Sequence, residues 1–169
     1  MIEPSVALFG DAYELVNGQL AGLLESARAR YALLVDKKGF VLAHREALWA
    51  PNPPSLDSMA TLIAGSAAAT SALARLVGEV QFHELIQQGE DVGLYLESVS
   101  EQTLLAVVFD HEALVGKIKL FARRVVAELR EILEQAAHSP APVQLDREFS
   151  TSASALLDDL FGKDAGGSA

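Results

Sequence analysis

The sequence predicts an α/β sandwich of three layers, with a five-stranded antiparallel sheet between helices. Three segments carry apolar residues at helical spacing, one near each end and one in the middle. Five short apolar runs lie between them, and the short connections make neighbouring strands antiparallel. The order is helix, two strands, helix, three strands, helix. We therefore expect the outer two helices to cover one face and the middle helix the other.

The first helix is predicted to begin at Asp11, whose side chain can accept a backbone N–H hydrogen bond while Glu14 reaches back. Its apolar residues repeat at helical spacing (Tyr13, Val16, Leu20, Leu23, Leu24 and Ala27). Two strands follow at residues 31–35 and 40–43. The four residues between them form a predicted hairpin turn, in which Gly39 supplies a positive φ.

The middle helix, residues 56–77, has no charged residue between Asp57 and Arg75. Three prolines precede it, Ser55 or Asp57 can cap it, and Gly78 can end it. One bulky stripe is predicted to pack on the sheet (Leu56, Met59, Ile63, Ala67, Thr70, Ala74 and Val77). The opposite side is small and uncharged (Thr61, Ala64, Gly65, Ala68 and Ala72, with Asp57 and Arg75 at its ends). Since a surface helix usually carries charges there, we predict that another protein covers it.

The second half of the chain is predicted to hold strands at residues 80–86, 92–96 and 103–109, followed by a third helix. That helix has a long apolar stripe (Leu114, Ile118, Phe121, Val125, Leu129, Ile132 and Ala136). We expect a domain over residues 1–137, a linker over 138–149, a short amphipathic helix over 150–162 and a disordered tail over 163–169. The short helix either packs on its own domain or binds a partner's groove.

The composition excludes several classes of partner and site. The chain has 13 Lys and Arg against 23 Asp and Glu, a net charge of −10, which argues against nucleic acid or an anionic membrane and favours a basic protein face. Residues 58–74 are long enough to span a bilayer, yet Ala, Ser, Thr and Gly are too weakly apolar to insert. The absence of cysteine excludes disulfides and thiolate metal sites. Residues 1–10 lack a secretory signal, so we expect a cytoplasmic protein.

No catalytic motif is present, so we expect no catalytic residue, metal or cofactor. Gly116 and Lys117 lack the upstream glycine of a phosphate-binding loop. Adjacent carboxylates on a helix, Asp158 and Asp159, point in different directions. The histidines (His44, His83, His111 and His138) have no metal-ligand spacing and fall in two strands, a loop and the linker. Arg75 is either an anchor for a partner or an arginine finger that enters a partner's active site, and the anchor is favoured.

Three segments together resemble a known family. They are RYALLVDKKGFVLAHREALWAP (residues 30–51, with Trp49), the alanine-rich helix after it, and the tail SALLDDLF. The chain resembles the MglB group of the roadblock family. The family has a profilin-like fold, and proteins of this group pair with the Ras-like GTPase MglA. The resemblance implies a homodimer that joins its sheets edge to edge and lays its two middle helices side by side.

In such proteins one GTPase in its GTP state docks across both subunits, and its GTP hydrolysis is accelerated. Carried over by position, the docking residues on the middle helix are Asp57, Thr61, Ala64, Gly65, Ala68, Ala72 and Arg75. Those on the appended helix are Leu156, Leu157, Leu160 and Phe161, which the resemblance places away from the nucleotide pocket.

The function expected from this resemblance is that of a GTPase activator in cell polarity or motility, without an active site of its own and located in the cytoplasm, including a cell pole. It would organise the catalytic residues of the GTPase itself. Two alternatives stay open. One is a roadblock dimer that anchors a GTPase without stimulating hydrolysis. The other is a small enzyme or ligand-sensing domain with a pocket in the sheet.

Overall fold

The structure is a computed structural model and describes residues 6–139. The chain divides into two units after Ala136, and the fold below is that of the first unit, with its last helix running through His138. Its elements in chain order are α1 (Gly10–Ala27), β1 (Tyr31–Asp36), β2 (Val41–Glu46), α2 (Leu56–Leu76), β3 (Glu84–Gln88), β4 (Val92–Ser98), β5 (Thr103–Asp110) and α3 (Val115–His138). The predicted appended helix and tail lie outside the described residues.

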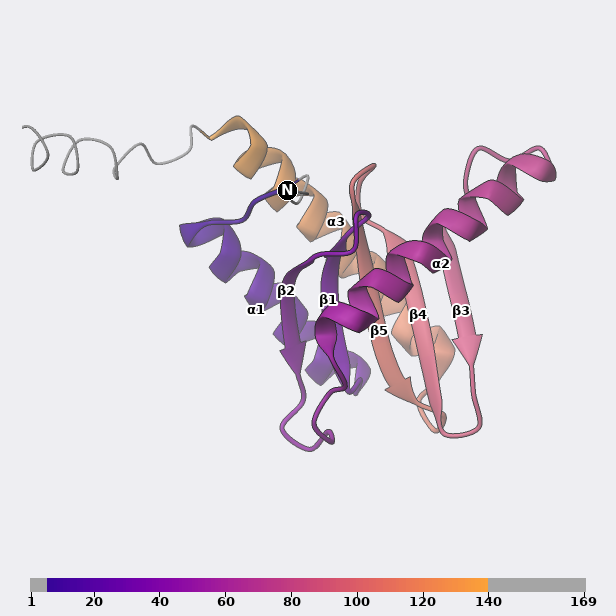
Figure 1. The fold of residues 1–169 in the computed structure, drawn as a ribbon. Coiled ribbons are helices and arrows are strands. Elements are labelled where there is room, and N and C mark those ends of the chain that lie inside the picture. Colours follow the sequence, from indigo (N-terminus) through magenta and orange to yellow (C-terminus); the bar gives the residue numbers. More distant parts are fainter. Residues whose placement is uncertain (1–5, 140–169) are drawn as a thin grey trace, which may run out of the picture. The chain divides into compact units, whose positions relative to one another are not determined.

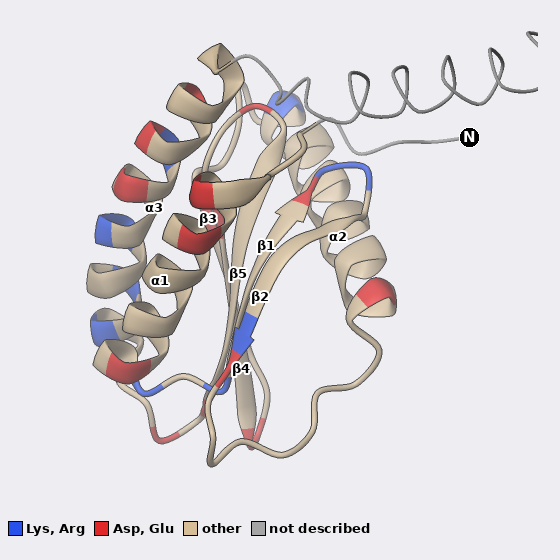
Figure 2. Ribbon diagram, turned by 90° about the vertical axis from the view of Figure 1, so that its left-hand side faces the viewer, with Lys and Arg blue, Asp and Glu red and all other residues tan. Residues whose placement is uncertain are grey.

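The five strands form one antiparallel sheet in the order β2-β1-β5-β4-β3. Helices α1 and α3 cover one face, and α2 covers the other (Figures 1 and 2). The predicted three layers, order of elements and antiparallel pairing are therefore confirmed. Strand β5 is the central strand, with β1 and β4 on its two sides, and β1 and β5 are buried along almost their whole length.

Each face of the sheet has its own apolar core. Alternate residues of a strand point to opposite faces, so β1 contributes Leu34 to the core beneath α1 and α3, and Leu33 and Val35 to the core beneath α2. The first core is the larger one. The core beneath α2 contains few helix residues, chiefly Ala60 and Ile63. Helix α2 is thus held on the sheet by a narrow apolar strip.

The predicted ends of α2 are confirmed. The Ser55 hydroxyl accepts a hydrogen bond from the Ser58 N–H at 3.3 Å, and Gly78 follows the helix with φ +87°. By length and composition α2 is the one helix in the described part of the chain that could cross a membrane. A helix that packs on a core passes the same test, and α2 packs on the sheet.

Several boundaries differ from the prediction. Strand β2 runs to Glu46 and not to residue 43, and β3 and β4 each end two residues later than predicted. Helix α1 begins at Gly10, and its N-cap is Phe9, whose apolar side chain cannot accept a hydrogen bond. Asp11 lies in the first turn of the helix and is not the cap. Strand β3 begins at Glu84 and not at residue 80, because Val80 is 89% exposed in the connection from α2. Leu114 is exposed just before α3 and does not join its buried stripe.

Candidate protein-binding surface

The outward side of α2 is exposed and uncharged along its middle. Six of the predicted docking residues lie on it: Asp57, Thr61, Gly65, Ala68, Ala72 and Arg75. Asp57 stands in the first turn and Arg75 in the last, so the charges lie at the two ends as predicted. The roughly five helical turns between these two residues carry no charged side chain.

Ala64 does not belong to this exposed side. It is 7% exposed, and it lies one turn after the fully buried Ala60 on the same side of the helix. The prediction grouped it with the small residues because its size fits them. Its angle around the helix instead brings it towards the sheet, so Ala64 supports the packing of α2.

Three leucines on the outward side were not predicted. Leu62, Leu73 and Leu76 are 73%, 53% and 85% exposed, so the surface is apolar rather than merely small. The sequence did contain a signal for them. A helix needs one apolar stripe to pack on a sheet. These three leucines lie outside the stripe predicted to face the sheet, so the sequence already places large apolar side chains on the outward side.

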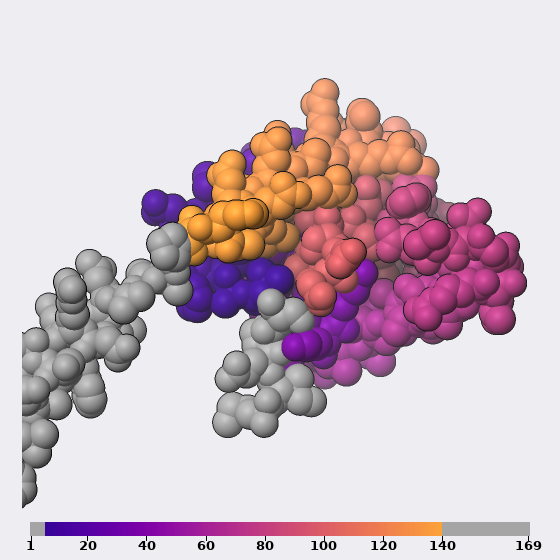
Figure 3. Space-filling view, turned by 90° about the horizontal axis from the view of Figure 1, so that it is seen from above, coloured from indigo at the N-terminus to yellow at the C-terminus, as the bar shows by residue number. Residues whose placement is uncertain are grey.

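Exposed apolar residues also gather where α2 ends. Leu76 is joined there by Val77, Val80 and Phe82, which are 63%, 89% and 38% exposed. The end of α2 extends past the edge strand β3 (Figure 1), and it forms one side of the domain in the view from above (Figure 3, magenta). The sequence placed Val77 in the sheet-facing stripe, but at this end no sheet lies beneath the helix. Exposed apolar residues grouped in this way are typical of an interaction site.

A groove lies beside this surface, between α2 and the β3–β4 hairpin. It has a volume of about 450 Å³ and is lined by residues of both elements, among them Met59, Leu62, Ser66, Gln88 and Gly93. Strand β3 forms the adjacent edge of the sheet. An edge strand presents unpaired backbone groups that can pair with another strand. The outward side of α2, the groove and the edge strand β3 therefore lie next to one another.

Ion pairs fix the start of this edge strand to α3. The Glu84 carboxylate pairs with the Lys119 ammonium, and the Arg123 guanidinium lies 3.5 Å from its second oxygen. The hydrogen bond from Lys119 lowers the pKa of Glu84 below its usual value. The Tyr95 hydroxyl donates to Glu97 at 2.7 Å, and burial raises the pKa of this phenol. The edge is thus held in place from the α3 side of the sheet.

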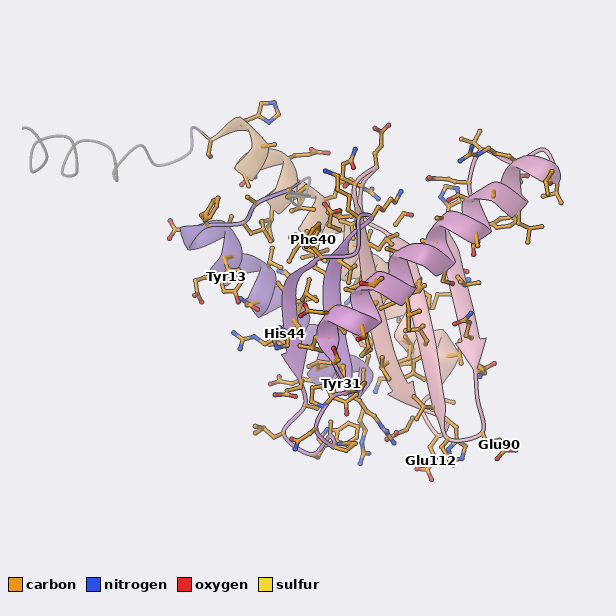
Figure 4. The ribbon with its side chains drawn as sticks, viewed as in Figure 1. Tyr13, Tyr31, Phe40, His44, Glu90 and Glu112 are labelled. Atoms are coloured by element: carbon orange, nitrogen blue, oxygen red, sulfur yellow. The ribbon has the colours of Figure 1, made fainter. Side chains whose placement is uncertain are left out.

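No group of three metal-ligating side chains occurs among residues 6–139. Possible metal ligands come from different parts of the sheet: His44 lies on the edge strand β2, whereas Glu90 and Glu112 lie at one end of the sheet (Figure 4). His83 precedes β3 rather than lying in it, and His138 ends α3 rather than lying in a linker. The four predicted tail contacts, Leu156, Leu157, Leu160 and Phe161, lie outside the described residues.

Comparison with known proteins identifies the relatives of this fold. The model of the Roadblock/LC7 domain matches residues 15–109. A structure described as MglB with a tetrameric arrangement is 52% identical, covers 80% of this chain and 99% of its own, and superposes with a TM-score of 0.78. The gliding protein MglB from Thermus thermophilus is 53% identical, with coverages of 79% and 99% and a TM-score of 0.77. Myxococcus xanthus MglB is 30% identical, with coverages of 71% and 95% and a TM-score of 0.66. A search of curated proteins found no significant match.

Proposed function

The chain belongs to the Roadblock/LC7 family, and from this membership we propose that it is a homodimeric regulator that accelerates GTP hydrolysis by an MglA-type GTPase. The observation that carries the proposal is the uncharged, leucine-bearing outward side of α2 on a chain 52–53% identical to MglB structures. Because the relatives include a gliding protein, we place the regulator in cell polarity or motility, in the cytoplasm and at a cell pole.

A two-fold dimer would cover the apolar surface at the end of α2. In such a dimer the same patch of each copy meets its counterpart. The end of α2, which extends past β3, would enter the groove beside β3 of the second copy, and the two edge strands would meet. The four-chain arrangement of one relative supports association of this kind.

Leu76→Asp should convert the dimer into a folded monomer. Leu76 is 85% exposed in the single chain, so the substitution costs the domain little, but it would bury an unpaired carboxylate in the dimer. We expect the dimer dissociation constant to rise at least about 100-fold, measured by sedimentation or light scattering over a concentration series. Leu48→Asp is the matched control, because Leu48 is fully exposed in the loop before α2. Equal dimerisation by the two variants would contradict this interface.

The two outward helix faces of such a dimer would form one seat for the GTPase. A Ras-like GTPase hydrolyses GTP slowly until its catalytic Gln and Arg are held around the γ-phosphate. A partner that binds the active switch conformation more tightly than other conformations raises its population and so the rate. The proposed regulator acts in this way and has no active site of its own. The predicted tail helix, with Leu156, Leu157, Leu160 and Phe161, would add a contact away from the nucleotide.

Arg75→Ala distinguishes an anchor from an arginine finger. Arg75 stands in the last turn of α2, at the margin of the seat, so as an anchor it contributes to binding alone. We expect the affinity for the GTP-bound GTPase to fall about 10-fold, while the single-turnover hydrolysis rate at saturating regulator stays unchanged. A finger contributes about 10³-fold or more to the rate. A fall of that size at saturation would therefore assign Arg75 to catalysis.

The experiment that tests the function is single-turnover phosphate release. The purified protein is mixed with the MglA-type GTPase of the same organism, loaded with GTP, over a range of regulator concentrations. A rate that rises to a plateau supports the activator. Binding without a rise in rate would replace it with a scaffold that only anchors the GTPase. Neither binding nor a rise would overturn the proposal and favour a different class of activity.

A further inference from the structure

The β1–β2 turn lies directly against the outward side of α2. A Cβ atom added to Gly39 would stand 3.2 Å from the Thr61 Cα and 3.4 Å from the Thr61 Oγ1. Thr61 is exposed, and its hydroxyl donates to the Asp57 carbonyl at 2.9 Å. Figure 2 shows the turn, with its basic residues in blue, beside α2. The turn and the helix, about twenty residues apart in the chain, therefore form one continuous surface.

Backbone hydrogen bonds hold the turn in one conformation. The Gly39 N–H donates to the Asp36 carbonyl at 2.8 Å, and the Lys38 N–H donates to the Asp36 carboxylate at 2.6 Å. The Lys37 N–H donates to the Gln102 carbonyl at 2.9 Å, which ties the turn to the neighbouring loop. Asp36 is fully buried. The backbone of the two lysines is thus ordered before any partner arrives.

Residues 37 and 38 place two lysines beside the uncharged side of α2. They are the central positions of a β-turn with glycine at its fourth position, and such positions accept most residue types. Lys38 is exposed, whereas Lys37 is half-buried and lines a narrow crevice with Ala67 and Ser71 of α2. Two adjacent cations therefore stand beside the uncharged side of α2, where a partner docked on that helix would meet their positive charge.

We infer that Lys37 and Lys38 belong to the seat for the GTPase and bind carboxylates on the docking face of that protein. The inference rests on the proposed function and adds to it the charge of the partner. The net charge of −10 predicts a basic partner overall, but the seat itself carries its cations at the turn. Opposite charges at the rim of an interface chiefly speed association and fix the register of docking.

The test compares two double variants with the same change in charge. One is Lys37→Glu with Lys38→Glu. The control is Lys117→Glu with Arg124→Glu, two exposed cations on α3, which covers the other face of the sheet. Binding to the GTPase loaded with a non-hydrolysable GTP analogue is measured by stopped flow and titration at low and high salt. Melting temperatures show whether each variant is folded, and Lys37→Arg with Lys38→Arg serves as the rescue variant.

We expect the turn variant to bind about 10-fold more weakly than the control at low salt, mainly through slower association. The difference should shrink at high salt because salt screens exposed charges. The arginine variant should bind like the wild type. Equal binding by the turn variant and the control would overturn the inference while leaving the proposed function intact. If the wild type does not bind the GTPase, the proposed function fails and the inference fails with it.

Discussion

Ala68→Arg is expected to abolish both binding and activation of the GTPase. Ala68 is exposed in the middle of the outward side of α2, so the domain itself loses no buried contact when the residue changes. In the assembly, however, a long cation would stand where two helices and the GTPase approach closely. We expect the affinity to fall at least about 100-fold, which is the effect of disrupting the centre of an interface.

The control for this experiment is Ala127→Arg, the same change at an exposed position of α3. Both variants should melt within a few degrees of the wild type, because exposed substitutions usually change the free energy of unfolding by less than about 0.5 kcal/mol. Affinity is measured by titration calorimetry and activation by phosphate release. If Ala68→Arg binds and activates as well as Ala127→Arg does, the outward side of α2 is not the seat.

Among glycine-to-alanine substitutions at the described glycines, Gly93→Ala is expected to destabilise the domain most. Gly93 pairs with Phe109 across β4 and β5, and the Phe109 ring is fully buried. A Cβ atom at position 93 would lie 2.4 Å from two carbon atoms of that ring. Real Cβ contacts are never so short, so the ring or a strand has to move within a packed core.

Overpacking of this kind costs about 1–3 kcal/mol in free energy of unfolding, and we expect a value near the upper end because the ring has no free side. For a domain of this size that corresponds to a fall of roughly 10 °C in Tm. Gly22→Ala in α1 is the control, since no atom lies within 4 Å of the added Cβ there. It should leave stability unchanged or raise it by up to about 1 kcal/mol. Urea titrations at one fixed protein concentration measure both. Equal stability of the two variants would contradict the packing described for Phe109.

The fold could be predicted from the sequence because it depends on local periodicity. The spacing of Val16, Leu20 and Leu24 in α1 and the continuous apolar run of β1 give the type of element directly. The turn at Gly39 and the stop at Gly78 follow from backbone conformations that glycine adopts most readily. Short connections then leave few ways to order the strands.

The details of the binding surface depend on contacts that no local pattern contains. Residues 80–83 alternate like a strand, but the sheet begins later because the end of α2 extends past its edge. The prediction assigned Ala64 by its size, whereas the angle at which α2 meets the sheet decides its burial. The approach of Gly39 to Thr61 joins segments that only the folded chain brings together, so no local pattern shows that the turn with Lys37 and Lys38 lies beside α2.

The number of copies of this chain that bind one GTPase tests the proposed assembly. In that assembly, two copies pair their α2 helices into one seat for the GTPase. Native mass spectrometry of the protein mixed with its MglA-type GTPase, loaded with a non-hydrolysable GTP analogue, should detect two copies of this chain with one GTPase. Hydrogen exchange should slow along residues 61–76 at the same time. A complex of one copy with one GTPase, or a free monomer with α2 unprotected, would show that the α2 helices do not pair into one seat.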